Sequence, residues 1–190
     1  MYRYGEEVNY SIEVLNESDY DSLMKFSCGN KKLDGFFHKE VFVNNKIVSD
    51  DGLIFKAINN DNVEIIGIVS LATSGIVFVQ TNYMKVLPAI KIDVFAVDLK
   101  YQKLHYSKYS EEEENPEEHY YLSDDIMGKI LFHCNEISEK YALVNYVLLY
   151  ADKNARRFYE RNGFTDFSEF MEKEKNMEIN ENIPMYIKLY

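Results

Sequence analysis

Several features that would place this chain in a well-known class are scarce or missing from its sequence. Its 190 residues contain only two cysteines, Cys28 and Cys134, which lie far apart, and four histidines without metal-ligand spacing. We therefore predict neither a disulfide nor a metal site. No apolar run is long enough to span a membrane, and the N-terminus lacks a basic region followed by an apolar one. We expect a cytoplasmic protein with no membrane partner.

Positive charge is also in short supply. The chain has 21 Lys and Arg against 32 Asp and Glu, a formal net charge of −11, with a sequence pI near 4.9. The field of such a protein repels nucleic acid and favours neutral or cationic partners. We therefore expect a small-molecule or peptide partner rather than a nucleic acid, unless a local basic patch overrides the overall charge.

The length and composition fit one domain. A chain of 190 residues with 46% hydrophobic and 15% aromatic content can bury one good core. No internal repeat is visible. We expect a single domain over residues 1–190.

Apolar periodicity and turn residues predict an alternation of strands and helices. Strands are expected at 10–15, 53–58, 63–71, 89–97, 144–150, 165–170 and 185–189, with a looser segment at 72–88. Helices are expected at 16–26, 33–43, 123–141 and within 152–163. Segments 53–58 and 63–71 form an antiparallel hairpin. The class that this order predicts is α+β.

The most informative segment is 151–164, Ala-Asp-Lys-Asn-Ala-Arg-Arg-Phe-Tyr-Glu-Arg-Asn-Gly-Phe. Asp152 and Asn154 are residues that start helices, and Gly163 is a residue that ends them. The apolar run before it is typical of a strand buried on both faces. The segment therefore predicts a short capped helix that follows a buried strand and carries Phe158 and Tyr159. Both rings are also consistent with ordinary core aromatics.

Three further segments resemble segments of a known family and follow one another in the same order as in that family. Residues 26–37 (Phe-Ser-Cys-Gly-Asn-Lys-Lys-Leu-Asp-Gly-Phe-Phe), 87–102 and 184–189, together with 151–164, resemble the GNAT N-acetyltransferases. They are similar to the bacterial branch that includes the acetyltransferase toxins of toxin–antitoxin pairs. The resemblance implies the GNAT fold, a central mixed and mostly antiparallel sheet flanked by helices, and acetyl-CoA as cosubstrate.

The resemblance also implies roles for individual residues. Tyr159 falls on the tyrosine that protonates the departing thiolate, for which a neutral phenol is a suitable acid. The positions that would bind acetyl-CoA are Phe95, Ala96 and Val97 through their backbone, Asn154 by hydrogen bonding, Phe158 by packing, and Gln102, Gly128 and Lys129 in the pyrophosphate region. Asn154 is equally consistent with a helix cap and Phe158 with a core residue.

The pyrophosphate loop departs from the family pattern R/Q-x-x-G-x-G/A, whose glycines let backbone N–H groups approach the anion. Gln102 is followed by no glycine, and an acidic insertion occupies about 103–122. Gly128, followed by Lys129, aligns with the last glycine of the pattern. The insertion is consistent with a solvated loop, a lid or a site for a basic partner. A general base stays open between Glu64 and Asp93.

These observations predict an N-acetyltransferase that moves an acetyl group directly from acetyl-CoA to a primary amine. One alternative is a catalytically inactive GNAT-fold binding or regulatory protein, which the missing glycines favour. A second is a toxin that acetylates aminoacyl-tRNA, the only case in which tRNA is expected. The amine acceptor, an antitoxin partner and a homodimer are all left open by the sequence.

Overall fold

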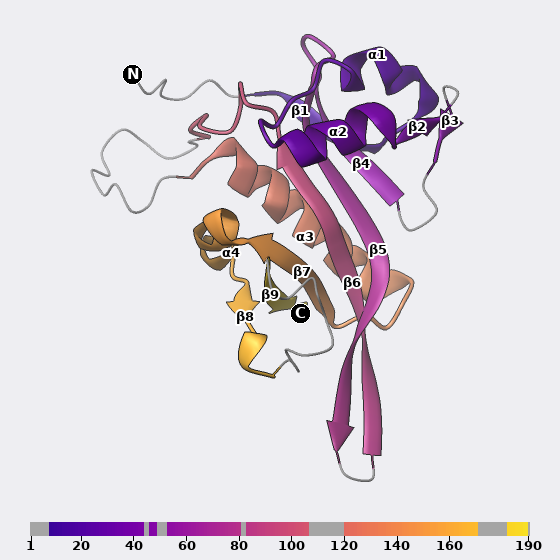
Figure 1. Cartoon of the computed structure of the whole chain (residues 1–190), viewed down its shortest axis with the longest axis vertical. Helices are drawn as coiled ribbons and strands as arrows, with labels where there is room; N and C mark the ends of the chain where they lie inside the picture. Colours follow the sequence, from indigo (N-terminus) through magenta and orange to yellow (C-terminus); the bar gives the residue numbers. More distant parts are fainter. Residues whose placement is uncertain are drawn as a thin grey trace, which may run out of the picture. The chain divides into compact units, whose positions relative to one another are not determined.

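Strands and helices alternate along the chain in the computed structural model, which describes residues 8–43, 46–48, 53–80, 83–106, 120–170 and 182–189 (Figure 1). The strands are β1 Tyr10–Val14, β2 Phe42–Val43, β3 Lys46–Ile47, β4 Leu53–Asn59, β5 Ile65–Gln80, β6 Tyr83–Val97, β7 Tyr146–Asp152, β8 Thr165–Asp166 and β9 Asn182–Lys188. The helices are α1 Tyr20–Leu23, α2 Lys31–Lys39, α3 Leu122–Lys140 and α4 Arg156–Arg161, with 3-10 turns η1 Glu17–Asp19, η3 Lys153–Ala155 and η4 Ser168–Phe170.

Seven of these strands form one mixed sheet in the order β1-β4-β5-β6-β7-β9-β8. β1 pairs antiparallel with β4, β7 and β8 pair antiparallel with β9, and β6 pairs parallel with β7. The parallel pair is connected through α3, as parallel strands require a crossover. This arrangement confirms the predicted α+β class with a mostly antiparallel sheet.

The chain divides into two compact units. The first comprises residues 1–70 and 94–126, and the second comprises 71–93 and 127–190. The strands β5 and β6 and the helix α3 each contribute to both units, because the divisions fall within them. Each unit is described by itself below.

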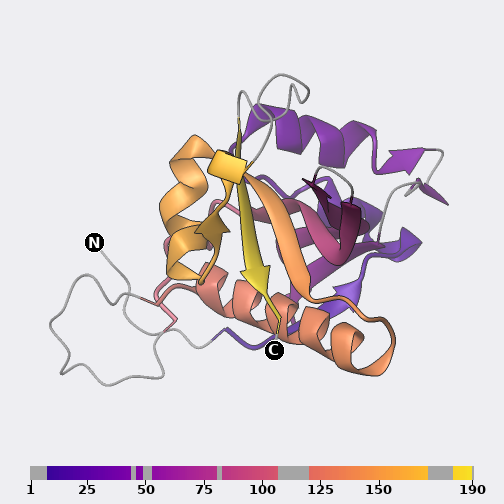
Figure 2. The same ribbon diagram turned by 90° about the horizontal axis from the view of Figure 1, so that it is seen from below.

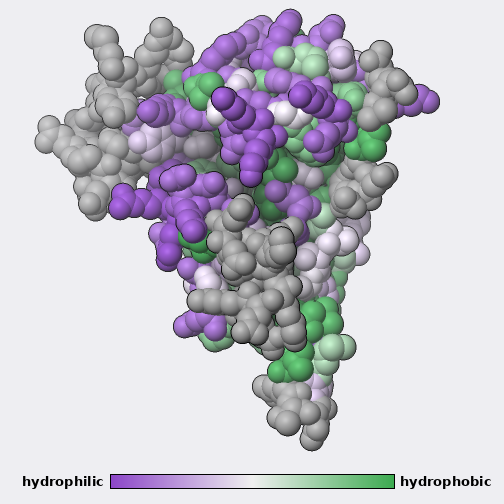
Figure 3. Space-filling model, in the orientation of Figure 1, coloured by the Kyte–Doolittle hydropathy of each residue, from purple (hydrophilic) through white to green (hydrophobic). Residues whose placement is uncertain are grey.

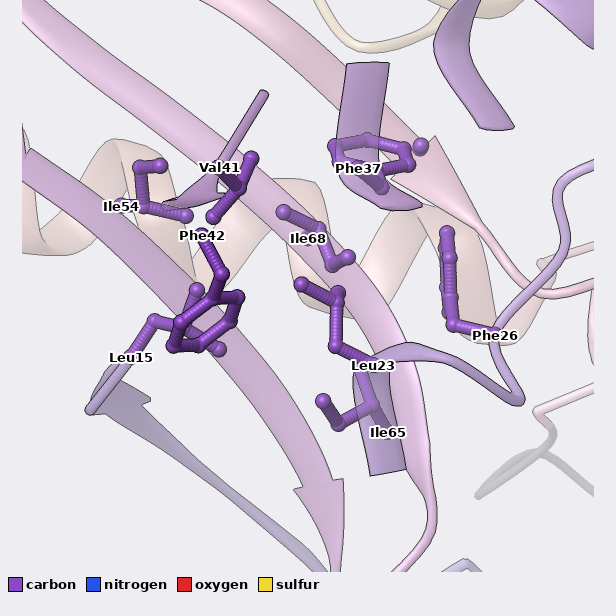
Figure 4. Packing of buried hydrophobic residues seen from close by; sticks show 10 residues of the cluster. Leu15, Leu23, Phe26, Phe37, Val41, Phe42, Ile54, Ile65 and Ile68 are labelled. Atoms are coloured by element: carbon purple, nitrogen blue, oxygen red, sulfur yellow. The ribbon is translucent and has the colours of Figure 1, made fainter. Parts of the chain in front are cut away.

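The core of the first unit lies where α1 and α2 pack on β4 and β5 (Figure 4). Phe26 and Phe37 are each 1% exposed and meet edge to face, with ring centroids 5.4 Å apart. Leu23 and Ile68 are fully buried beside them. One ion pair is also buried in this unit, where Lys56 Nζ of β4 lies 2.6 Å from Asp19 Oδ1.

In the second unit, β7 is paired with β6 on one side and with β9 on the other, and its middle residues are buried. Val147 is fully buried and Leu149 is 2% exposed. Figure 2 shows α3 running alongside β7 and β9, with α4 near β8. Phe167 packs edge to face on Tyr186 at 5.7 Å, in a cluster with Leu148 and Ala89.

Three sequence predictions need correction. Residues 72–88 are not a loose segment, because β5 runs to Gln80 and β6 begins at Tyr83. The helix predicted at 33–43 ends at Lys39, and Phe42 reaches the core from the strand β2 instead. The strand predicted at 165–170 is only two residues long before the turn η4. Among the described helices, none has the length and apolar character needed to cross a bilayer.

Candidate functional site

The residues predicted to handle acetyl-CoA fall into two groups. Phe95, Ala96, Val97 and Gln102 belong to the first unit. The second unit holds Gly128, Lys129, Asn154, Phe158 and Tyr159. The structure therefore assigns the backbone groups expected to pair with the cosubstrate to one unit and the expected acid to the other.

The pairing of β6 with β7 lies in the part of β6 that belongs to the second unit. The β6–β7 ladder joins Ala89–Ile92 to Tyr146–Leu149 and ends there. The following stretch still belongs to β6, and Ala96 and Val97 are 5% and 6% exposed. Backbone groups of an extended strand can pair with an extended ligand, and such pairing by residues 95–97 stays a prediction.

Gln102 has a clear structural task in the first unit. Its Nε2 donates to the Val97 carbonyl at 2.9 Å and to the Cys28 carbonyl at 2.8 Å. The turn between Val97 and Gln102 is held by Asp98, which is 6% exposed and accepts from the Ser27 and Lys100 backbone N–H groups. The amide of Gln102 thus fixes the turn that follows β6, and a role toward phosphate stays a prediction.

The segment 26–37 packs against this turn through Ser27 and Cys28. Its contacts explain why particular residues stand in this segment. The Asp34 carboxylate accepts from the Cys28 backbone N–H and the Ser27 hydroxyl, both at 2.8 Å. Gly29 has a φ of +81°, and a Cβ there would lie 2.9 Å from Leu99 Cδ2, so glycine is required. Asp34 was not among the predicted site residues, although an acid in the first turn after the Asn30 cap was its signal.

The two described flanks of the acidic insertion are hydrogen-bonded to each other. Tyr106 N donates to the Tyr120 carbonyl, Leu122 N donates to the Leu104 carbonyl, both at 2.9 Å, and His105 bridges to Tyr121. Residues 107–119, which carry the glutamates, lie outside the described residues. The two described flanks of the predicted insertion thus form a short antiparallel pair that leads into α3.

Two acidic side chains in the first turn of α3 accept hydrogen bonds from neighbouring groups of the chain. Tyr121 N donates to Asp124 Oδ2 at 2.9 Å, and Asp125 accepts from the Tyr10 hydroxyl at 2.5 Å and from that of Tyr120 at 3.3 Å. Burial, and then the hydrogen bond to Asp125, raise the pKa of Tyr10 well above its ordinary value. Burial likewise raises the pKa of Tyr120 to about 12. Two carboxylates therefore stand at the helix N-terminus, where a bound phosphate would be repelled.

This start of α3 corrects the reason for choosing Gly128. The helix begins at Leu122, so Gly128 lies in its second turn, where backbone N–H groups bond within the helix. Its N–H is not available to cradle an anion. Gly128 and Lys129 are both exposed, and a contact between the Lys129 ammonium and phosphate stays a prediction.

The β7–α4 corner has the predicted form. Asp152 ends β7 and its Oδ1 accepts from the Asn154 backbone N–H at 2.8 Å, which caps the turn η3. The cap is therefore Asp152, and the side chain of Asn154 is exposed. Gly163 follows the end of α4 with a φ of +86°. This left-handed conformation is the one in which glycine commonly ends a helix. Sequence thus predicted both ends of this element.

Tyr159 is the buried aromatic of α4. It is 9% exposed, and its ring lies 5.0 Å from that of Phe158 and 5.8 Å from that of Phe164. Burial, together with the negative charge of Asp152, raises the pKa of Tyr159 to about 12. The phenol is therefore protonated at neutral pH, which is the state that a general acid needs.

Phe158 lies half-buried next to Tyr159. Its ring faces the Arg161 guanidinium at 5.6 Å, within cation–π range, and its carbonyl accepts from Asn162 Nδ2 at 2.8 Å. Phe158 is thus less buried than a core residue, and packing against a pantetheine arm stays a prediction.

The two candidate bases differ in their surroundings. Glu64 accepts from Lys100 Nζ and from the Tyr101 hydroxyl, both at 3.1 Å, and the hydrogen bond to Lys100 is the main reason that its pKa is lowered. Asp93 pairs with Lys91 at 2.7 Å and is exposed. A carboxylate stabilised in its charged form is a weak base, so Glu64 gains no support from its geometry and the general base stays open.

The fold is similar to that of solved bacterial toxins, which bears out the fold expected from the resemblance. No family model matches the sequence, and no curated protein matches it either. A mutant of the toxin AtaT bound to the C-terminus of the antitoxin AtaR and acetyl-CoA has a TM-score of 0.61 at 18% identity, over 94% of this chain and 92% of that one.

Two further structures show similar agreement. AtaT complexed with acetyl-methionyl-tRNAfMet has a TM-score of 0.63 at 16% identity, over 95% of both chains. The KacTA–DNA complex has a TM-score of 0.62 at 14% identity, over 95% of this chain and 93% of that one.

These neighbours overturn one expectation. The net charge of −11 led us to expect no nucleic-acid partner, yet proteins of this fold are seen with tRNA and with DNA, and with an antitoxin that we had left open. Net charge is a poor criterion because it averages over the whole surface, whereas nucleic acid responds to local patches.

Proposed function

We propose that this chain is an acetyl-CoA-dependent N-acetyltransferase that transfers the acetyl group directly to a primary amine. Tyr159 supports the proposal most directly, because it is buried, keeps its proton with a pKa of about 12, and lies in the short helix where the family's acid is expected. The solved toxins of the same fold are seen with acetyl-CoA.

The chemistry assigns a role to each group. The backbone of Phe95, Ala96 and Val97 pairs with the pantetheine arm and polarises the thioester carbonyl, which lowers the barrier to amine attack. The amine nitrogen forms the new amide bond as the carbon–sulfur bond breaks, and the proton that the nitrogen loses passes to solvent. Tyr159 gives its proton to the departing thiolate and regains one from solvent. No covalent enzyme intermediate is required.

The test begins with calorimetric titration of the full chain with acetyl-CoA, followed by an assay of thiol release with an amine acceptor. We expect the Tyr159→Phe variant to bind acetyl-CoA as the unaltered protein does and to turn over roughly 100-fold to 10,000-fold more slowly, the usual effect of losing a general acid. Tyr141→Phe, at an 82% exposed tyrosine, is the matched control.

Two outcomes would contradict the proposal. The first is absence of acetyl-CoA binding by the full chain, which would leave the inactive binding module predicted as an alternative. The second is binding with a Tyr159→Phe variant that turns over like the control, which would remove the acid from Tyr159.

A second candidate function is acetylation of the amino group of aminoacyl-tRNA. Four exposed cations cluster on η3 and α4 of this acidic chain, namely Lys153, Arg156, Arg157 and Arg161. Arg156 is paired with Glu160 and Asp166, and Arg161 stacks on Phe158. Local cations bind phosphate backbones regardless of distant negative charge, because exposed charges are screened beyond about 10 Å.

The acceptor test compares aminoacyl-tRNA with spermidine and a short peptide. We expect the Lys153→Glu, Arg157→Glu double variant to lower kcat/KM for aminoacyl-tRNA at least tenfold, with little change for the small amines. Lys188→Glu, an exposed lysine on β9, is the control. An equal loss for all acceptors would contradict a tRNA role for α4.

A further inference from the structure

A lysine ammonium is bound on one face of the sheet in the second unit. Lys91 lies on β6, and its Nζ is 5.3 Å from the centre of the Tyr150 ring on β7 and 2.7 Å from Asp93 Oδ1. The first distance is within cation–π range, and the second is that of a charged hydrogen bond. The chain thus shows, with one of its own side chains, a place where a ring and a carboxylate bind a primary alkylammonium.

The register of β6 and β7 brings these three side chains together. Lys91 is the partner of Leu148 in the parallel ladder, and residues two apart in a strand point to the same face. Asp93 and Tyr150 each follow one member of this pair by two residues, so both lie on the face of Lys91. The opposite face of β7 carries Val147, which is fully buried.

Solvent reaches this cluster. The side chains of Lys91 and Asp93 are 26% and 31% exposed, and Tyr150 is half-buried. An ion pair with this exposure contributes little to stability, so a competing cation can separate the two charges at small cost. The Lys91 ammonium is therefore an exchangeable occupant of the place between Asp93 and Tyr150.

The cluster belongs to the unit that holds the proposed acid. Tyr150 lies near the end of β7, and α4, which carries Tyr159, follows β7 and packs against it. Figure 3 shows hydrophilic side chains over α4. In a direct transfer the acceptor nitrogen and the departing sulfur are bonded to the same carbon, so the acid and the acceptor work close together.

The composition of the cluster selects an organic cation. A carboxylate alone also suits a hard metal ion, which prefers several oxygen ligands. A ring face attracts an ammonium instead, through its quadrupole. The net charge of −11 attracts cations to the chain, so acceptors that carry more than one ammonium are drawn toward it unless a residue excludes them.

We propose that Asp93 and Tyr150 form an ammonium subsite for the acceptor, and that Lys91 fills this subsite and so excludes acceptors with a second positive charge. The selective role rests on the proposed transferase function, whereas the existence of the subsite does not. An alkyl diamine has to displace Lys91, and a monoamine does not. Lys91 then determines specificity by exclusion and takes no part in the chemical step.

The first test measures binding without turnover, in NMR titrations of the isotope-labelled full chain with butylammonium chloride. Lys91→Met removes the ammonium and keeps the apolar stem. We expect this variant to bind butylammonium about tenfold more tightly than the unaltered chain, the size of one exposed ion pair and one cation–π contact together. Adding Asp93→Asn or Tyr150→Leu to Lys91→Met is expected to abolish the gain.

Lys85→Met is the matched control, because Lys85 is an exposed lysine of the same strand. It is expected to bind butylammonium as the unaltered chain does. Circular dichroism confirms that each variant is folded. Lys91→Gln, for which the same results are expected, replaces Lys91→Met if the latter fails to fold.

The second test compares butylamine with putrescine, two acceptors that differ by one ammonium. For the unaltered chain we expect putrescine to be the poorer acceptor. In Lys91→Met, the ratio of kcat/KM for putrescine to that for butylamine is expected to rise about tenfold. Adding Asp93→Asn is expected to reverse the rise, and Lys85→Met is expected to leave the ratio unchanged. Cadaverine and longer diamines are included, because the distance from the reacting nitrogen to the subsite sets the best length.

Two results would overturn the proposal. The first is a Lys91→Met variant that binds butylammonium no better than the unaltered chain, or whose gain survives Asp93→Asn. The second is a chain that acetylates amines with a diamine-to-monoamine ratio that Lys91→Met does not change. Failure of the proposed function is a different result, namely no turnover with any amine. It would remove the selective role of Lys91, while the binding test would still decide whether the subsite exists.

Discussion

The buried ion pair between Lys56 and Asp19 offers the sharpest test of the first unit. The two side chains are 4% and 8% exposed and the ammonium lies 2.6 Å from Asp19 Oδ1, while Glu13 approaches at 3.5 Å from a half-exposed position. The other carboxylate oxygen accepts from the Asn16 backbone N–H at 2.8 Å. Replacing Lys56 with Met keeps the apolar stem and leaves the carboxylate buried with one hydrogen bond.

We expect Lys56→Met to lower the free energy of unfolding by about 3–5 kcal/mol, the usual cost of leaving one buried charge without its partner. That is a large part of the roughly 5–15 kcal/mol that stabilises a typical domain. The double variant Lys56→Met, Asp19→Asn removes both charges and is expected to recover a substantial part of the loss, because no buried charge is left.

Urea unfolding followed by circular dichroism measures these changes, since the chain has no tryptophan for a fluorescence probe. Lys100→Met is the matched control, because Lys100 pairs with Glu64 at 3.1 Å with side chains 68% and 44% exposed, and exposed pairs contribute about 0–1 kcal/mol. Equal losses for Lys56→Met and Lys100→Met would refute the reasoning from burial, as would a double variant less stable than Lys56→Met alone.

Three further predictions concern glycines and titrating groups. Because burial raises the folded pKa of Tyr159 from 10.0 to about 12, its contribution to stability is full below pH 10 and is lost as pH rises toward 12; we expect the urea midpoint to fall less over this window in Tyr159→Phe. Gly29→Ala forces a side chain into positive φ against Leu99 and should cost about 1–2 kcal/mol, whereas Gly35→Ala inside α2, where nothing lies within 4 Å, should add about 0.5–1 kcal/mol; melts that shift in the same direction would contradict this pair. Burial acts to raise the pKa of Asp34, but hydrogen bonds from its neighbours outweigh it and lower the pKa, so its stabilisation is lost as pH falls below about 3.8; acid titration of Asp34→Asn should show a shallower decline than the unaltered chain.

Strongly patterned elements could be predicted from sequence, whereas residues 76–80 of β5 and 83–87 of β6 could not. The hairpin of β4 and β5, the helix α3 and the β7–α4 corner each have one buried face or clear end residues, which is what periodicity and capping rules detect. These two segments have no buried face, so their residues lack the alternation of a half-buried strand. Their β-prone composition, Ile-Val-Phe-Val and Tyr-Met-Lys-Val, is the feature of the sequence that indicates strands there.

Gly128 shows how a family alignment can conflict with local physics. The helix prediction at 123–141 agrees closely with α3 at Leu122–Lys140, and that prediction already places Gly128 too far inside the helix to offer a free N–H. The support for this glycine is its likeness to the last glycine of the family pattern, which precedes a helix in that pattern. The carboxylates of Asp124 and Asp125, both in the first helical turn, were visible in the sequence and are typical of that position.

The altered start of α3 has a defined kinetic meaning if the chain is a transferase. A pyrophosphate cradle holds the cosubstrate equally before and during the reaction, so it lowers KM without raising kcat. The groups expected to act only as charge develops are the thioester-binding backbone of residues 95–97 and the acid Tyr159, and neither belongs to the predicted cradle. A helix start that carries Asp124 and Asp125 in its first turn is therefore expected to weaken binding of the polyanion and to leave the chemical step intact. We therefore predict a high KM for acetyl-CoA with an ordinary kcat, whereas loss of the acid would lower kcat itself.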